Sequence, residues 1–400
     1  MANLLGERRF RRLFTAATTS GLGDGLRITA FAVFAATLTR DPFQVTLVAV
    51  AAHLPWVLVG PFIGALVDHL DHTRALRACY LVQAVVMTAF VALILTHRAS
   101  IPVLIVVAFV MTSVETMAYN LIQAATPELS GSADLNAANS WLQGGQFIAT
   151  EFLGAPLGAA LFVVGWQLPF LIDAMTFGVA AILLLGLKGK GPPTPRVDFR
   201  SLFRETADGC AWLFRHRLLR TVCLLVGIAN LTTVGAISIS VLYALEILHI
   251  SRTGYGLLML IIAVGGLLGL IAVRKIAALL GNERTLGAAL AVLPLAFLAG
   301  SLTSEPIVAA LAFALVGAGI SAGRVVTTTM RQIMVPQHMF GKVTGAFALF
   351  ISGTAPIGAL LAGVIADRYG LRAPFFAGTF VLALTALAAF RELFRAAKDQ

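Results

Sequence analysis

The chain has 400 residues, of which 58% are hydrophobic and only 12% are charged, and its mean hydropathy is +0.90. Soluble domains carry about 25% charged residues, so this composition excludes an ordinary soluble globular protein and predicts a polytopic membrane protein. A net charge of +10 would suggest a nucleic-acid partner in a soluble protein. In a membrane protein the charge has to be assigned loop by loop, and we expect no nucleic-acid partner.

The apolar segments run past 20 residues without the alternation of a strand, so they predict helices and not a β-barrel. We place twelve spans, and the predicted fold is an all-α membrane protein with twelve transmembrane helices. Their predicted bounds are 13–38, 43–67, 75–96, 102–127, 136–163, 168–187, 219–247, 254–273, 285–303, 306–330, 343–366 and 374–394.

The basic residues are distributed unevenly over this map. Of the 29 Lys and Arg residues, 22 fall on the side of the N-terminus and 5 on the other side, while Arg27 and Arg324 lie inside spans. Loops rich in Lys and Arg stay in the cytoplasm. The distribution therefore predicts that both termini are cytoplasmic, and the positive charge of the chain describes its topology.

The first span contains two charges, Asp24 and Arg27, in the run Gly-Leu-Gly-Asp-Gly-Leu-Arg. Asp24 lies eleven residues into the span, about 16 Å along a helix, which is near the middle of a bilayer core about 30 Å thick. A charge at such a depth costs about 2.5 to 3.5 kcal/mol. The pair is either a structural ion pair between helices or a proton or substrate site on a water-filled path. Depth in the membrane favours the functional site.

The second span ends in Gly64 and Asp68, and a short loop with Arg74 follows. This stretch resembles the cytoplasmic loop signature of the major facilitator superfamily, Gly-x-x-x-Asp-Arg-x-Gly-Arg-Arg. Gly64 and Asp68 match it, whereas His69 replaces the first arginine. The resemblance implies a gating loop formed by Gly64, Asp68 and Arg74. The alternative is a solvated turn with ordinary loop charges.

The fourth span carries Glu115, Tyr119 and Gln123, which recur every four residues and form a polar stripe on one helix face. Glu115 lies about 20 Å from the outer end, at a depth close to that of Asp24, so Arg27 can pair with either carboxylate. The stripe either forms hydrogen bonds between helices or includes a carboxylate that carries a proton.

The fifth span carries a polar face with Gln146, and Glu151 lies next to that face. Gly154, Pro156 and Gly158 follow and predict a bend, because proline removes one backbone hydrogen bond. The stretch resembles the Gly-Pro-rich fifth-span signature of antiporters in the same superfamily. The bend is either an ordinary kink or the flexible part of a rocking helix.

The sixth span carries Asp173 in the run 171–177. This run and the opening segment, with 10–13 and 23–25, are similar to the macrolide-efflux-like drug:proton antiporter branch of the superfamily. That branch implies a multi-pass protein of the bacterial plasma membrane whose partners are a small amphiphilic substrate and protons. A monomer without a cofactor is expected.

Residues 188–218 interrupt the apolar pattern with a Pro- and Gly-rich stretch and then an amphipathic helix. We therefore predict two bundles, 1–187 and 219–400, joined by a cytoplasmic linker over 188–218. Residues 355–359, with Pro356, copy 155–159, which predicts two pseudo-symmetric six-helix bundles around a central cavity. In the tenth span, Arg324 either pairs with an acid such as Asp173 or Glu151 or extends toward the cytoplasm.

The spans contain more acids than bases, as a proton-coupled exporter of cationic or neutral amphiphiles needs. We expect Asp24 and Glu115 to carry protons and bind substrate, with Arg27 tuning them. The predicted function is therefore proton-coupled efflux of amphiphilic drugs or antibiotics by alternating access. An exporter dedicated to one metabolite such as a siderophore, and a transporter-like sensor or assembly protein without transport, stay open as alternatives. No nucleophile–base pair or metal-ligand spacing is present in the sequence, so neither an enzyme nor a metal site is expected.

Overall fold

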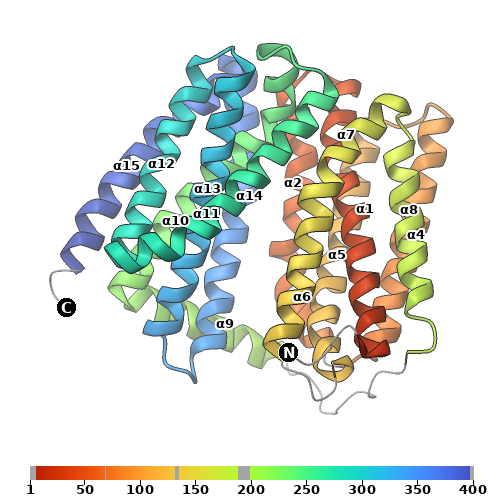
Figure 1. Ribbon diagram of the computed structural model, residues 1–400, viewed down its shortest axis with the longest axis horizontal. Coiled ribbons are helices and arrows are strands. Elements are labelled where there is room, and N and C mark those ends of the chain that lie inside the picture. Colours follow the sequence, from red (N-terminus) through yellow and green to blue (C-terminus); the bar gives the residue numbers. More distant parts are fainter. Residues whose placement is uncertain (1–5, 68, 131–134, 188–198, 397–400) are drawn as a thin grey trace. The chain divides into compact units, whose positions relative to one another are not determined.

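The computed structural model describes residues 6–67, 69–130, 135–187 and 199–396, and every regular element within these ranges is helical (Figure 1). Ten of the described helices are long and apolar enough to cross a membrane, and α2 (Pro42–Leu58) and α8 (Leu168–Leu183) are shorter apolar helices. The all-α prediction is therefore confirmed. In a bilayer core helices satisfy their own backbone hydrogen bonds, which explains why such apolar segments adopt this structure.

The chain divides into two compact units, residues 1–39 with 51–199 and residues 40–50 with 200–400. Besides α8 and part of α2, the first contains α1 (Arg8–Leu38), α3 (Gly60–Val67), α4 (His72–Leu95), α5 (Ile101–Leu129), α6 (Leu135–Phe147), η2 (Ile148–Gly154) and α7 (Ala155–Val164). The second contains α9 (Phe199–Arg215), α10 (Arg217–Leu242), η3 (Tyr243–Ile247), α11 (Arg252–Leu280), α12 (Asn282–Leu302), α13 (Pro306–Met334), α14 (Phe340–Tyr369) and α15 (Ala373–Ala396).

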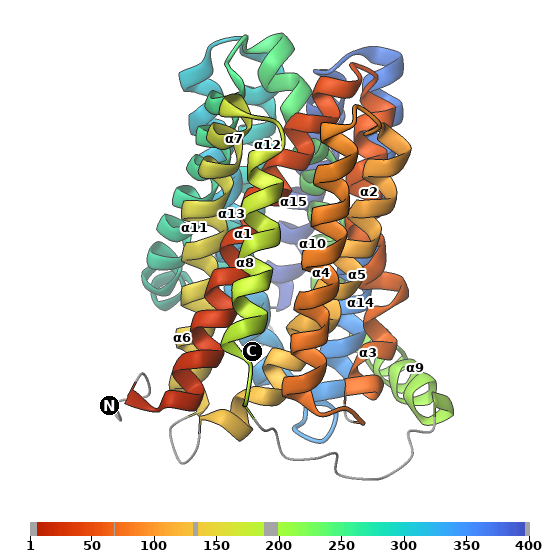
Figure 2. The same cartoon turned by 90° about the vertical axis from the view of Figure 1, so that its right-hand side faces the viewer.

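Helix α1 packs against α5, α6, η2, α7 and α8, and Figure 2 shows it next to α8. Two glycines of α1 permit this close packing. A Cβ atom at Gly23 would overlap the side chains of Asp173 and Thr176 on α8, and one at Gly25 would overlap the backbone of η2. Small residues let helix backbones approach closely in a membrane, so α1 lies tightly between two neighbours.

The predicted fifth span is not one regular helix. It consists of α6, the π-helical segment η2 and α7, and the N–H of Ala155 donates to the carbonyl of Thr150, five residues back. Pro156 explains the wide turn, because it has no N–H and its ring crowds the carbonyl four residues before it. Gly154 ends this π-helical segment and Pro156 follows it, whereas the bend expected at Gly154, Pro156 and Gly158 stays a prediction.

The predicted second span is divided into α2 and α3 by a turn at Val59. Pro55 and Pro61 flank this turn, and neither residue can donate a backbone hydrogen bond. Helical hydrogen bonds continue across the break, from Val59 N–H to Pro55 O at 2.8 Å and from Ile63 N–H to Val59 O at 3.2 Å. The turn therefore interrupts the helix only locally.

The repeat between residues 155–159 and 355–359 corresponds to the same helix contact in both units. Gly158 of α7 lies against the carbonyl of Leu26 on α1, and Gly358 of α14 lies against the carbonyl of Leu231 on α10. Pro356 lies inside the continuous helix α14, unlike Pro156, which follows a π-helical segment. The sequence repeat is thus reflected in packing, whereas the local helix geometry differs.

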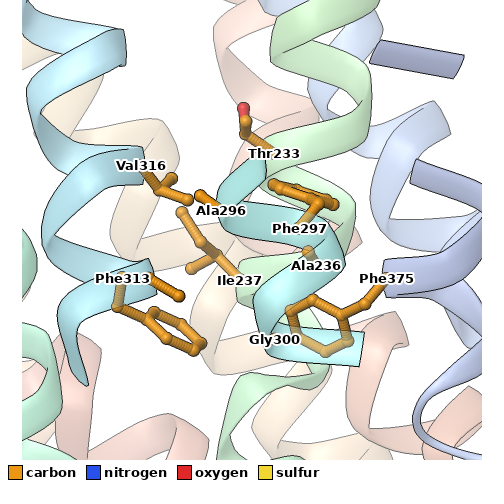
Figure 3. A pocket seen from close by; sticks show the side chains of 10 residues that line it. Thr233, Ala236, Ile237, Ala296, Phe297, Gly300, Phe313, Val316 and Phe375 are labelled. Carbon is orange, nitrogen blue, oxygen red and sulfur yellow. The ribbon is translucent and has the colours of Figure 1, made fainter. Parts of the chain in front are cut away.

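Aromatic rings fill part of the core of each unit. In the first unit, Phe90 and Phe170 have centroids 5.1 Å apart and pack with Phe31 and Phe34. In the second, Phe297, Phe313 and Phe375 surround a void of about 10 Å³ (Figure 3). The lining of this void is almost entirely apolar, and a dry gap of this size is ordinary core packing.

Candidate functional site

Arg27 lies at the centre of an acidic cluster within the first unit. Its Nη2 atom is 2.6 Å from Oδ1 of Asp24 and 2.8 Å from Oε2 of Glu115, and its Nε atom is 3.4 Å from Oδ2 of Asp173. The Arg27 side chain is 2% exposed. The structure therefore brings together four of the charged residues predicted from the sequence.

Three helices supply these side chains. Asp24 and Arg27 are three residues apart on α1 and so share one helix face. Glu115 comes from α5 and Asp173 from α8. Gly23 of α1 has no side chain and so leaves room for the Asp173 carboxylate. The guanidinium also lies 5.7 Å from the ring centroid of Phe31, an apolar surface that limits its hydration.

The cluster contains more acid than base. The positive charge of one guanidinium can balance the negative charge of one carboxylate. Three carboxylates lie 2.6 to 3.4 Å from the Arg27 guanidinium. Charges taken out of water are costly unless they are paired or neutralised. A proton or an added cation at Asp24 or Glu115 would bring the cluster closer to neutrality, so this arrangement can bind positive charge.

A cavity of about 180 Å³, here called the chamber, lies beside this cluster inside the first unit. Asp24 and Glu115 line it, with side chains that are 14% and 28% exposed. The ring centroids of Trp56 and Tyr119 lie 5.8 Å apart and form an aromatic part of the wall. The chamber thus combines carboxylates with aromatic and polar groups, here Ser20, Trp56, Tyr80, Gln83, Tyr119, Gln146 and Thr150.

The other predicted site residues lie away from the chamber wall. Gln123 is exposed on α5, and Glu151 is exposed on η2. Asp173 is fully buried behind α1. Arg324 is exposed on α13 of the second unit, and its pairing with an acid stays a prediction.

Four polar or aromatic chamber residues, Ser20, Trp56, Tyr80 and Gln83, were not identified from the sequence. Ser20 donates a hydrogen bond to the Tyr80 hydroxyl at 3.2 Å. Gln83 is 1% exposed, and its Oε1 atom has no hydrogen-bond partner among the described residues. The signal for Gln83 was available, because it is an amide in the middle of the apolar span 75–96.

Two of the predicted gating residues lie on either side of the loop between α3 and α4. Gly64 lies in α3 and Arg74 in the first turn of α4, whereas Asp68 lies outside the described residues. The Nε atom of Arg74 is 3.3 Å from Oδ2 of Asp71, and the N–H of Arg74 donates to Asp71 Oδ1 at 3.0 Å. Burial raises the pKa of Asp71, but the hydrogen bonds from Arg74 and Thr73 and the Arg74 charge outweigh it and hold that pKa below its ordinary value.

Comparison with known proteins finds relatives that share about a quarter of their residues with this chain. The multidrug efflux pump Tap of Mycolicibacterium fortuitum is 26% identical over 374 residues, which cover 90% of each chain. Tap of Mycobacterium tuberculosis H37Rv is 26% identical over 385 residues, covering 92% of this chain and 90% of that protein. Relatives with this coverage match the chain along nearly its whole length.

Solved transporters share the fold. The nucleoside transporter NupG superposes with a TM-score of 0.77 at 12% identity and covers 96% of this chain and 99% of its own. A bacterial homologue of the human lysosomal transporter Spinster, in an inward-facing occupied conformation, gives a TM-score of 0.74 at 16% identity and covers 96% of each chain. These identities establish likeness of fold alone.

The family described as transmembrane secretion effector matches residues 3–400. This match, the apolar helices and the transporter fold make the protein a multi-pass membrane protein. The chain belongs to the transmembrane secretion effector family of the major facilitator superfamily.

Proposed function

We propose that this protein is a secondary active transporter that exports small amphiphilic drugs in exchange for protons. Support comes from relatives named multidrug efflux pumps that match about nine-tenths of the chain. The observation that carries the proton coupling is the sharing of Arg27 between Asp24 and Glu115 at the wall of the chamber. Asp24 and Glu115 are the proposed proton and substrate carboxylates.

The proposed architecture has twelve spans in two six-helix bundles, 1–187 and 219–400, with a cytoplasmic linker over 188–218. The ten long apolar helices and the shorter α2 and α8 supply enough segments for this count. Both termini are proposed to lie in the cytoplasm of a bacterial cell, with the monomer in the inner membrane. The excess of Lys and Arg on the side of the N-terminus supports this orientation.

The coupling works through charge. A proton from outside neutralises Asp24 or Glu115 and reduces the cost of keeping that side chain in a closed, poorly hydrated site. Loss of the proton to the cytoplasm restores a carboxylate to which a cationic or donor-bearing cargo can bind. Proton and cargo therefore compete for the same carboxylates, which is sufficient for exchange when the chamber opens to one side at a time.

The remaining predicted residues have supporting roles in this proposal. Gly64, Asp68 and Arg74 belong to a cytoplasmic gate. Gly154, Pro156 and Gly158 form the bending region next to α1, where Gly154 and Gly158 pack closely on that helix. Tyr119 and Gln146 contribute to the cargo surface, because both line the chamber.

The test is transport in inverted membrane vesicles with an imposed proton gradient and a fluorescent cationic dye. Wild-type vesicles should accumulate the dye, and accumulation should collapse when a protonophore removes the gradient. Asp24→Asn and Glu115→Gln should each abolish gradient-driven accumulation. Glu305→Gln is the matched control, because Glu305 is an exposed acid at the beginning of α13.

Two results would contradict the proposal. Gradient-driven accumulation that persists in both chamber variants would remove Asp24 and Glu115 from the coupling. Vesicles with well-expressed wild-type protein that transport none of a panel of structurally unrelated amphiphiles would exclude a multidrug exporter.

A further inference from the structure

Asp173 carries a fully buried carboxylate on α8. Its side chain is 0% exposed, and neither Oδ1 nor Oδ2 has a hydrogen-bond partner within the described part of the chain. Buried polar atoms are almost always paired, so this residue needs an explanation. Gly23 holds open the space that the carboxylate fills, since a Cβ atom there would overlap Asp173.

The nearest cation has a matching unpaired group. Arg27 uses Nη2 for both Asp24 and Glu115, whereas its Nε atom is buried and also lacks a hydrogen-bond partner among residues the structure describes. This Nε atom lies 3.4 Å from Oδ2 of Asp173. A guanidinium has donors on two edges, so a small rotation would form the missing hydrogen bonds with Asp173.

We infer that Asp173 is a second counter-ion for Arg27, to which the guanidinium turns when a cationic amine occupies Asp24 and Glu115. This inference rests on the proposed function, because it assumes that cargo binds at the chamber. Asp173 is a positioning residue in this scheme, since it lies behind α1 and touches Arg27 and not the cargo. The carboxylates that face the chamber thereby become free for the positive head of the cargo.

The charges around Arg27 explain why two positions are available. From α1 it faces Asp24, from α5 Glu115 and from α8 Asp173. Tyr80 of α4 lies near Asp24, and Glu151 of η2 is exposed. With both chamber carboxylates ionised, Nη2 stays between them. A cation bound at Asp24 and Glu115 repels the Arg27 guanidinium. Asp173 is then the remaining carboxylate with which Arg27 can pair.

The test measures binding, not transport, so that it is independent of proton coupling. Purified protein is equilibrated by dialysis at pH 7.5 with trimethyl(naphthylmethyl)ammonium or with its neutral analogue, in which carbon replaces the nitrogen. Asp173→Asn should weaken binding of the cation by about tenfold, within the usual range of coupling between sites. It should leave the neutral probe unchanged within about twofold, and Asp173→Glu should restore cation binding in part.

A double variant separates positioning from a purely structural effect. With Arg27→Gln as the background there is no guanidinium to move, so adding Asp173→Asn should change cation binding no further. An equal loss in both backgrounds, or an unchanged cation affinity in folded Asp173→Asn, would overturn the inference. Neither result would affect the dye transport that tests Asp24 and Glu115.

Discussion

Arg27 compensates three acids with one side chain, so its removal should be costly. We predict that Arg27→Met lowers the free energy of unfolding by about 3–5 kcal/mol, because it leaves buried carboxylates without a counter-ion. Thermal unfolding of the purified protein in detergent measures this loss. The matched control is Arg274→Met at an exposed position of α11, which should change stability by no more than about 0.5 kcal/mol. Equal effects of the two substitutions would mean that the cluster does not depend on Arg27.

Gln83 should contribute to cargo binding and not to stability. Its buried Oε1 atom has no partner in the described structure, so Gln83→Leu removes an unsatisfied acceptor and should leave the melting temperature equal or higher. The same change should weaken binding of a naphthylmethylammonium probe with N–H donors by about tenfold, the equivalent of 1.4 kcal/mol. Equilibrium dialysis of the wild-type protein and the Gln83→Leu variant with this probe checks the prediction. A destabilised Leu variant with unaltered affinity would assign Gln83 to core packing instead.

At the residue scale, the charged residues of the Arg27 cluster could be predicted from the sequence, whereas the side chains that they contact could not. Asp24, Arg27 and Glu115 stand out because ionised groups are rare in apolar spans. Gln123 shares the four-residue spacing of Glu115 and Tyr119, yet eight residues at 3.6 per turn rotate it by about 80° from Glu115, and it is exposed. The contact of Asp173 with Arg27 depends on how α8 is rotated against α1, which hydrophobic periodicity alone does not determine.

At the level of elements, the short distance between the backbones of α1 and η2 depends on Gly25. A Cβ atom there would overlap the carbonyl of Thr150 and the backbone of Gly154. Gly25→Ala should therefore cost about 1–3 kcal/mol, the usual penalty of overpacking. Gly144→Ala is the control on α6, because nothing among the described residues lies within 4 Å of its added Cβ. That change should be neutral or stabilise by up to about 1 kcal/mol, as thermal unfolding of both variants would reveal. Similar losses at both positions would contradict this packing.

Helix α4 begins at an N-cap that titrates. Asp71 accepts a hydrogen bond from the N–H of Arg74, and Asp71→Ala should cost about 0.5–2 kcal/mol near neutral pH. The pKa of Asp71 is lower in the folded protein than its ordinary value of 3.8. Its stabilisation is therefore fully present above that ordinary value and is lost as pH falls through the folded pKa. Melting curves of wild type and Asp71→Ala should differ at pH 7 and converge as the pH falls through the folded pKa of Asp71. A gap that stays constant over this range would exclude capping by the ionised carboxylate.

The positions of most helices followed from hydropathy, but two irregularities did not. The turn at Val59 and the segment η2 both occur inside continuous apolar runs. Hydropathy reports where the chain prefers lipid, whereas these breaks arise from backbone groups that lack hydrogen bonds near Pro55, Pro61 and Pro156. The prolines indicated a bend near Pro156, but Pro356 in the equivalent position lies in a regular helix. The choice between a kink, a π-helical turn and a continuous helix therefore depends on packing with neighbouring helices.

For the whole molecule, the internal repeat and the distribution of charge were the informative signals. The repeat around Gly158 and Gly358 corresponds to equivalent contacts with the carbonyls of Leu26 and Leu231. A single helix pair of this kind in each unit is what duplication of a six-helix segment would leave behind. The charge distribution adds the predicted orientation, since basic loops are retained in the cytoplasm.

This orientation predicts the outcome of reporter fusions. Alkaline phosphatase inserted after Ala99, in the turn between α4 and α5, should be active because that turn is expected outside the cytoplasm. The same enzyme inserted after Gly281, between α11 and α12, should be inactive, and green fluorescent protein fused to the C-terminus should fluoresce. The physical reason is the loop charge, because Arg274, Lys275 and Arg284 surround the second site and each basic residue disfavours translocation. Phosphatase activity at both insertion sites would require an even number of spans between them and would contradict the twelve-span topology, which places five there.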